Sequence, residues 1–153
     1  MSARRPVIAI ALSAAGFIGI AVSEGYRGTA YIPVPGDVPT IGLGTTEGVK
    51  LGDTITVERA LVRSLSDIAK FEGAVKQCVK VPLSQNEYDA YTRLAYNIGA
   101  RNFCGSTLVE HLNNGEYAAA CAEISRWNRA GGKVLRGLVN RRAEERALCE
   151  KSD

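Results

Sequence analysis

The sequence predicts an α+β protein, with a small sheet followed by a mainly helical body, on three observations. Residues 23–46 are rich in glycine, proline and β-branched residues, which is typical of short strands joined by turns. From Thr56 onward, apolar residues recur every three or four positions, the spacing of amphipathic helices. A length of 153 residues, with 46% hydrophobic and 23% charged residues, is the size of one globular domain.

The charge balance and the cysteines exclude several classes of function. Nineteen Lys and Arg against sixteen Asp and Glu leave a formal net charge of +3, too balanced for a dedicated nucleic-acid-binding protein. The four cysteines have no CxxC spacing, and the sequence has one histidine, His111. A zinc site or a Cys–His nucleophile would therefore lack its usual partners. We therefore expect no metal and no cofactor. An even number of scattered cysteines instead suits two disulfides and an oxidising compartment.

The amino-terminal segment begins with Arg4 and Arg5 and continues over residues 6–22 for seventeen positions without a charge. As a helix this run would reach about 25 Å, a little short of the ~30 Å hydrocarbon core of a bilayer. Eight of its seventeen residues are Ala, Gly or Ser, so we expect its affinity for lipid to be weak. Three interpretations stay open: a signal peptide cleaved after Ser23, a permanent anchor with the arginines in the cytoplasm, and a buried helix.

The remaining elements follow in chain order. Residues 23–46 are expected to form the small sheet, and Thr56 caps a long amphipathic helix whose apolar residues recur from Val57 to Phe71. Ser84 and Glu87 form a capping box that opens a helix, which Gly99 ends. Further helices are expected at residues 106–113, 116–127 and about 133–150. Arginines and glutamates are interleaved on the last of these, which indicates a solvated face: Arg136, Arg141, Arg142 and Arg146 with Glu144, Glu145 and Glu150.

Two acidic side chains in the glycine- and proline-rich region have the chemistry of a glycosidase pair. Glu24 lies two residues past the apolar run, where burial beside apolar groups favours the protonated form that a general acid needs. Asp37 lies in a Pro-Gly-Asp turn, where a carboxylate stays solvated and ionised. One protonated acid and one ionised carboxylate is the arrangement that glycoside hydrolysis requires. Most such residues are merely solvated, so this pair does not by itself establish an activity.

An ordered set of motifs is far more specific than the acidic pair. Residues 24–31 are followed by Val38-Pro39-Thr40-Ile41-Gly42-Leu43-Gly44-Thr45-Thr46. The carboxy-terminal half adds Ala95-Tyr96-Asn97-Ile98-Gly99, Phe103, Ser106-Thr107-Leu108, Leu112-Asn113-Asn114-Gly115, Arg126-Trp127, Ala130-Gly131-Gly132-Lys133, Gly137-Leu138, Arg141-Arg142 and Glu145. In this order the motifs resemble the phage-type lysozymes, glycoside hydrolase family 24, from residue 24 nearly to the end. The resemblance implies a small β-hairpin lobe and a mainly helical lobe, with the catalytic cleft between them.

The family's functional residues carry over position by position. Glu24 matches the family's general acid, and Thr40 matches the threonine that helps to hold the attacking water. The family commonly has its aspartate nine residues after the glutamate, where this sequence has Pro33, and one extra residue precedes Thr40. Asp37 is the one acid inside the hairpin, and we assign to it the positioning or activation of water. Thr45 stands where the family usually has a histidine that is thought to be structural.

The resemblance implies a muramidase that cleaves the β-1,4 bond between N-acetylmuramic acid and N-acetylglucosamine in peptidoglycan for host cell lysis, with inversion. Inversion needs the two carboxyl groups roughly 6.5 to 9.5 Å apart, which admits the water. Asn97 and Trp127 are candidates for lining the saccharide cleft, and each also has a structural interpretation, Asn97 at a helix end and Trp127 in packing. The alternatives are a non-catalytic, membrane-tethered cell-wall-binding protein and a lytic transglycosylase, which needs the acid but no water-activating aspartate.

The same resemblance changes the interpretation of the amino terminus. Cleavage after Ser23 would leave Glu24 as the terminal residue, without a helix to hold it, which argues against a cleaved signal. Residues 1–22 instead resemble the signal-anchor-release segment of some phage endolysins, and residues 23–153 then form the catalytic domain. We expect a monomeric enzyme that residues 6–22 tether to the host inner membrane, facing the periplasm, and that is later released to the periplasm. This segment contains no cysteine, so disulfide exchange within it is not expected as a control.

For the four cysteines we favour the pairs Cys78–Cys104 and Cys121–Cys149. Cys78 and Cys104 flank the helix that begins after Ser84, and Cys121 and Cys149 lie on the last two long helices. Four cysteines allow three connectivities, and buried free thiols are a further alternative.

Overall fold

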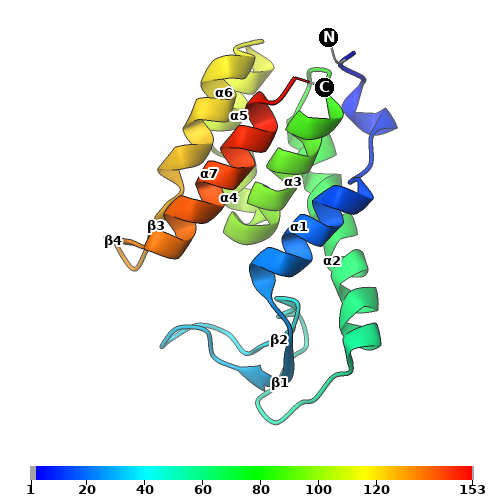
Figure 1. The fold of residues 1–153 in the computed structure, drawn as a ribbon, viewed down its shortest axis with the longest axis vertical. Helices are drawn as coiled ribbons and strands as arrows, with labels where there is room; N and C mark the ends of the chain where they lie inside the picture. The colour runs from blue at the N-terminus through cyan, green and yellow to red at the C-terminus, as the bar shows by residue number, and fades with distance from the viewer. Residues whose placement is uncertain (1–2, 153) are drawn as a thin grey trace. The chain divides into compact units, whose positions relative to one another are not determined.

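A computed structural model describes residues 3–152 (Figure 1). The chain forms two compact units. The helical unit takes in the described parts of Met1–Phe17 and Phe71–Asp153, and the β unit is Ile18–Lys70. The chain passes from one unit to the other within two helices, α1 (Ala14–Glu24) and α2 (Val57–Cys78). The predicted order, a small sheet and then a helical body, is confirmed.

The β unit is built on the antiparallel strands β1 (Arg27–Tyr31) and β2 (Thr40–Gly42). Arg27 pairs with Gly42 and Tyr31 with Thr40, with an irregularity between these two pairs. Ala30 of β1 and Ile41 of β2 form a small apolar core with Val49, against which Ile55 packs. Eight residues, 32–39, connect β1 to β2, and they include the Pro-Gly-Asp turn.

The helical unit surrounds α3 (Gln85–Ile98), whose inner side chains Tyr88, Tyr91 and Leu94 are fully buried. The predicted capping box is present: the Ser84 hydroxyl accepts from the Glu87 amide at 3.1 Å, and the Glu87 carboxylate accepts from the Ser84 amide at 2.8 Å. Around α3 lie α4 (Ala100–Cys104), α5 (Thr107–Asn113), α6 (Tyr117–Glu123), the 3₁₀ turn η2 (Ile124–Arg126) and α7 (Arg136–Glu150). Helix α7 packs along α3 (Figure 1).

The expected last helix begins later than predicted. Residues 129–134 form a two-stranded hairpin, β3 (Arg129–Ala130) with β4 (Lys133–Val134), and α7 starts only at Arg136. Gly131 and Gly132 occupy the turn with φ of 57° and 76°. Two successive residues with positive φ are what a two-residue hairpin turn of the favoured hand requires, and a Gly-Gly pair supplies them without strain.

The prediction that the arginines and glutamates of the last helix form a solvated face is wrong for one pair. Arg142 and Glu145 are 1% and 0% exposed, and their charged groups lie 2.7 Å apart. A buried charge requires a partner, and these two residues, three apart on α7, supply each other's. Charge alternation in the sequence does not distinguish a buried ion pair from a solvated one.

The cysteine pairs favoured from the sequence lie at disulfide distance, both within the helical unit. Cys78 and Cys104 have their Cα atoms 5.6 Å apart, and the Cα atoms of Cys121 and Cys149 are 5.7 Å apart. Both separations are those of ordinary disulfides. The two bonds close loops of similar length, which ties α2 to α4 and α6 to α7.

The amino-terminal residues are folded against the helical unit. Val7, in the 3₁₀ turn η1 (Val7–Ala9), and Ile10 belong to its main apolar core, and Arg5 pairs with Leu83 through two backbone hydrogen bonds of 2.8 and 2.9 Å. Residues 10–13 are not helical, and α1 starts at Ala14. No helix within residues 3–152 combines the length and the apolar character needed to cross a bilayer.

Candidate active site

Glu24 is the last residue of α1 and is half-buried within the β unit. The next residue, Gly25, has a φ of 68°, which ends the helix and turns the chain into β1. The carboxyl group is thus carried at a helix end, immediately before a strand. This placement fixes the backbone that bears the predicted general acid.

A tight turn after β2 supports the Glu24 carboxyl. Ile41 and Thr45 exchange two backbone hydrogen bonds of 2.9 and 3.0 Å, which places Gly44 inside the turn with a φ of 91°. A Cβ atom added to Gly44 would lie 3.0 Å from Oε2 of Glu24 and 3.4 Å from its Cδ. The carboxyl group therefore lies directly against the Gly44 backbone, and only glycine leaves room for it there.

Asp37 and Thr40 both hydrogen-bond to the backbone of Val38. Asp37 is exposed, and its Oδ1 accepts a hydrogen bond from the Val38 amide at 2.9 Å. Thr40 is 6% exposed, and its hydroxyl donates to the Val38 carbonyl at 3.2 Å. The carboxylate retains further acceptor capacity toward solvent, and the threonine oxygen can still accept.

Thr45, at the position where the family usually has a histidine, forms a buried hydrogen bond to helix α2. The hydroxyl of Thr45, which is 2% exposed, donates to Oδ2 of Asp67 on α2 at 2.6 Å. This bond fixes the turn that carries Gly44 to the helix beneath it. Gly44 lies in the family motif but had no role assigned from the sequence, and nothing in the sequence pointed to Asp67, although two glycines flanking one residue after a strand indicate a tight turn.

Asn97, a predicted cleft residue, belongs to a buried polar network of the helical unit. Its Oδ1 accepts from Nη1 of Arg142 at 2.8 Å, and Arg142 also donates to Glu145 at 2.9 Å and to the Trp127 carbonyl at 3.4 Å. Burial raises the pKa of Glu145, and the charge of Arg142 opposes that shift. The network joins the end of α3 to α7 and to the segment that carries Trp127.

Trp127, the other predicted cleft residue, is half-buried and packs against the main core of the helical unit. It also lines an open cavity of about 320 Å³, together with Ser106, Thr107, Glu123 and Arg126. Hydroxyl, charged and aromatic groups around one hollow are typical of saccharide binding, in which rings stack and polar groups orient. Among residues 3–152, no group of three or more His, Cys, Asp or Glu side chains could hold a metal ion.

Comparison with known proteins places these features in a family. The family model described as phage lysozyme matches residues 21–145. The endolysin of Bacillus phage PZA is 42% identical over 90% of this chain, which spans 54% of that protein's length. The SAR-endolysin of Pseudomonas phage phiKMV is 40% identical over 95% of this chain and 91% of its own.

A solved structure agrees with the sequence comparison. The endolysin from Escherichia coli O157:H7 phage FAHEc1 superposes with a TM-score of 0.81 at 35% identity, over 93% of this chain and 94% of that one. The family-model match covers most of both the β unit and the helical unit, including the Glu24 turn. The chain therefore belongs to the phage lysozyme family and is a glycoside hydrolase of the lysozyme type.

Proposed function

We propose that this lysozyme is a muramidase that hydrolyses the β-1,4 bond between N-acetylmuramic acid and N-acetylglucosamine, with Glu24 as the general acid. The observation that carries the proposal is the contact of the Glu24 carboxyl with Gly44, because it fixes an acid next to the strand that bears Thr40. In the reaction, Glu24 donates its proton to the glycosidic oxygen. The bond to the anomeric carbon then breaks as oxocarbenium character develops.

Asp37 and Thr40 hold the attacking water in this mechanism. Asp37 accepts one proton of the water and Thr40 orients its oxygen, so that the water adds to the anomeric carbon as the leaving sugar departs. Attack by water on the face opposite the leaving group inverts the anomeric configuration. Asn97 and Trp127 are proposed to contact the glycan strand, Trp127 directly along its cavity and Asn97 from the network beside it.

Product analysis tests the chemistry of the proposal. Purified protein acting on peptidoglycan should release muropeptides with reducing N-acetylmuramic acid ends, because water is the nucleophile. A 1,6-anhydro product would show that the substrate's own hydroxyl attacks, which is the lytic transglycosylase reaction. No product at all, with retained binding, would indicate a cell-wall-binding protein.

Replacing the water-holding carboxylate separates the hydrolase from the transglycosylase at residue level. Asp37→Ala should lower the rate of peptidoglycan hydrolysis about 10²-fold or more, the usual contribution of a positioned base. The matched control is Asp53→Ala, which removes another exposed aspartate of the β unit. Equal activity of Asp37→Ala and Asp53→Ala would contradict the role of Asp37.

We further propose that the enzyme is an endolysin that residues 6–22 first tether to the host inner membrane and that is then released to the periplasm. The uncharged run of seventeen residues and the similarity to a SAR-endolysin support this course. The folded arrangement of residues 3–24 then corresponds to the released form, because Val7 and Ile10 lie in a protein core. Fractionation of cells that export the chain, before and after collapse of the membrane potential, should show its transfer from membrane to periplasm.

A further inference from the structure

The segment that precedes α1 is held on the helical unit by polar contacts that the mechanism does not use, and two of them involve buried carboxylates of α3. One site binds Arg4 and the other binds Ser13, and both lie on or beside α3. Between them, the side chain of Gln85 donates to the Ala11 carbonyl at 2.9 Å. Residues 4–16 therefore dock on α3 by polar groups as well as by their apolar side chains.

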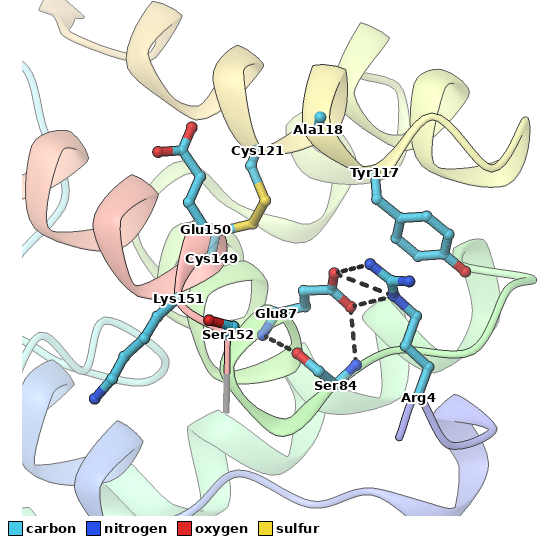
Figure 2. Close-up of a pocket in the computed structure, with 10 residues that line it drawn as sticks. All are labelled: Arg4, Ser84, Glu87, Tyr117, Ala118, Cys121, Cys149, Glu150, Lys151 and Ser152. Carbon is cyan, nitrogen blue, oxygen red and sulfur yellow. Dashed lines mark hydrogen bonds and ion pairs between the residues drawn. A yellow bond between two sulfur atoms is a disulfide. The ribbon is translucent and has the colours of Figure 1, made fainter. Parts of the chain in front are cut away.

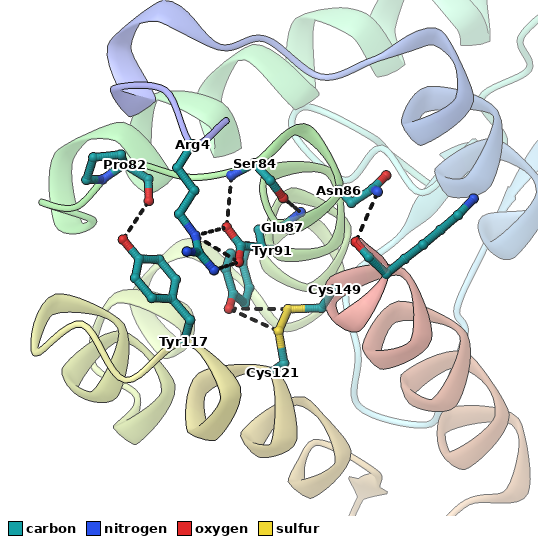
Figure 3. A network of polar contacts seen from close by, with 10 residues as sticks. Arg4, Pro82, Ser84, Asn86, Glu87, Tyr91, Tyr117, Cys121 and Cys149 are labelled. Carbon is teal, nitrogen blue, oxygen red and sulfur yellow. Dashed lines mark hydrogen bonds and ion pairs between the residues drawn. A yellow bond between two sulfur atoms is a disulfide. The ribbon is translucent and has the colours of Figure 1, made fainter. Parts of the chain in front are cut away.

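At the first site, Arg4 forms a two-nitrogen contact with a buried carboxylate. Its Nη2 lies 2.8 Å from Oε1 of Glu87, and its Nε lies 3.1 Å from Oε2 (Figure 2). The Glu87 side chain is 6% exposed, and the Arg4 guanidinium carbon lies 3.6 Å from the ring centroid of Tyr117. The Tyr117 hydroxyl donates to the Pro82 carbonyl at 2.9 Å, which holds the ring in place (Figure 3).

Both carboxylate oxygens of Glu87 have hydrogen-bond partners. One oxygen accepts from the Ser84 amide in the capping box, and both oxygens contact Arg4. Without Arg4, the carboxylate would keep its helix-capping bond but lose this ion pair. A carboxylate shielded from water is costly unless a cation and hydrogen bonds satisfy it. The buried Glu87 carboxylate therefore favours a positively charged partner at this point.

At the second site, a buried carboxylate receives the start of α1. Oδ1 of Asp89, a residue 3% exposed, accepts from the Ser13 amide at 3.0 Å, and Oδ2 accepts from the Ser13 hydroxyl. The Ser13 hydroxyl in turn accepts from the Gly16 amide at 3.0 Å, so Ser13 caps the first turn of the helix. A Cβ atom on Gly16 would lie 2.9 Å from Cγ of Asp89, so a glycine is required for this approach.

From the sequence alone, Arg4, Ser13 and Gly16 are explained by membrane topology. The contacts described above give these residues a second role, in the folded protein. In the proposed tethered state, Arg4 is one of the charges that hold the amino terminus in the cytoplasm while residues 6–22 span the bilayer. Ser13 and Gly16 belong to the small residues that make the span weakly hydrophobic. In the folded protein, Arg4 contacts Glu87, and Ser13 and the backbone at Gly16 lie against Asp89.

We propose that Glu87 and Asp89 form a capture site that binds Arg4 and Ser13 of the released segment and prevents its return to the membrane. This inference rests on the proposed tethered state. In the tethered state, both carboxylates lack these partners, and the Ser13 amide is satisfied within a membrane helix. On release, the segment exchanges those bonds for contacts with the capture site, which lowers the free energy of the soluble form relative to the inserted form.

The test uses the purified full-length protein and vesicles of phosphatidylethanolamine with a minor share of phosphatidylglycerol. Flotation measures the ratio of vesicle-bound to free protein. Arg4→Lys keeps the positive charge but loses the planar two-nitrogen contact and the stacking on Tyr117. Glu87→Gln keeps an acceptor for the capping box but loses the charge. Each variant should raise the bound-to-free ratio about tenfold, equivalent to ~1.4 kcal/mol.

The control is Arg146→Lys, which alters another Arg–Glu pair on the helical unit. Nε of Arg146 lies 2.7 Å from Glu150, and the Arg146 side chain is 41% exposed, against 44% for Arg4. This variant should partition as the wild type does. The double variant Arg4→Lys/Glu87→Gln should resemble either single variant, because each single variant already removes the same Arg4–Glu87 interaction. Ser13→Ala tests the second site independently and should also raise the bound fraction.

Wild-type partitioning by Arg4→Lys, Glu87→Gln and Ser13→Ala would overturn the capture site. An equal rise in Arg146→Lys would also overturn it, because the effect would then reflect general destabilisation. Failure of the tethering proposal has a different signature: exported wild-type protein would show no membrane-bound pool in cells, whatever the vesicle result for the folded protein.

Discussion

Gly44 provides the sharpest test of how the fold positions the general acid. Replacing it with alanine has two separable consequences. A φ of 91° is unfavourable for any residue with a Cβ, at a cost of about 1–3 kcal/mol of folding stability. The added methyl group would also lie 3.0 Å from Oε2 and 3.4 Å from Cδ of Glu24, so the carboxyl has to move aside.

The size of the activity loss follows from that displacement. Misplacement of a catalytic group by about 1 Å can cost on the order of 10²-fold in rate. A shift of several tenths of an ångström in Glu24 should therefore lower the lytic rate of Gly44→Ala by about 10- to 100-fold. The assay is clearing of turbid, outer-membrane-permeabilised cells, with each rate normalised to the folded fraction measured by urea unfolding.

Gly52 supplies the matched control within the same unit. Its φ is 97°, close to that of Gly44, and an added Cβ meets nothing within 4 Å. Gly52→Ala should lose about the same stability as Gly44→Ala and retain its specific activity. Equal specific activities of the two folded variants would refute the role of the Gly44 turn in positioning Glu24.

Three further predictions concern stability and are read by urea unfolding. Thr45→Val removes a buried hydrogen bond to a carboxylate and should cost about 1.5–3 kcal/mol, with Thr46→Val as an exposed control; an unchanged midpoint would contradict this. Glu145→Ala leaves the buried Arg142 charge without its main partner and should cost about 3–5 kcal/mol, and a loss below 1 kcal/mol would show that the pair is not buried in solution. Replacing both Cys121 and Cys149 by serine opens a bridge between residues 28 apart and should cost about 3.5 kcal/mol, whereas no loss would indicate free thiols.

Local signals in the sequence predict much of this fold. Ser84 and Glu87 are three residues apart, and a capping box needs nothing from the rest of the chain, so the start of α3 follows from the sequence alone. The glycine- and proline-rich region likewise predicts a small sheet. The Gly-Gly pair at residues 131–132 is an equally local signal for a hairpin. The prediction of a helix from about residue 133 did not take this signal into account.

Features that depend on distant residues are not available from local patterns. The ion pair of Arg142 with Glu145 has the spacing of an exposed helical pair, and its burial is decided by packing against α3 and Asn97. Arg4 meets Glu87 across 83 positions of sequence, which no periodicity reveals. Gly44 becomes part of the site only because a tight turn brings it under the carboxyl of Glu24.

The most direct test of the central claim is the lytic rate of Glu24→Gln. The amide has nearly the same shape as the acid but cannot donate the proton that the leaving sugar needs. We expect its rate to fall about 10²- to 10⁴-fold, the usual contribution of a general acid, with a urea midpoint close to that of the wild type. A folded Glu24→Gln variant that clears cells at the wild-type rate would contradict the assignment of Glu24.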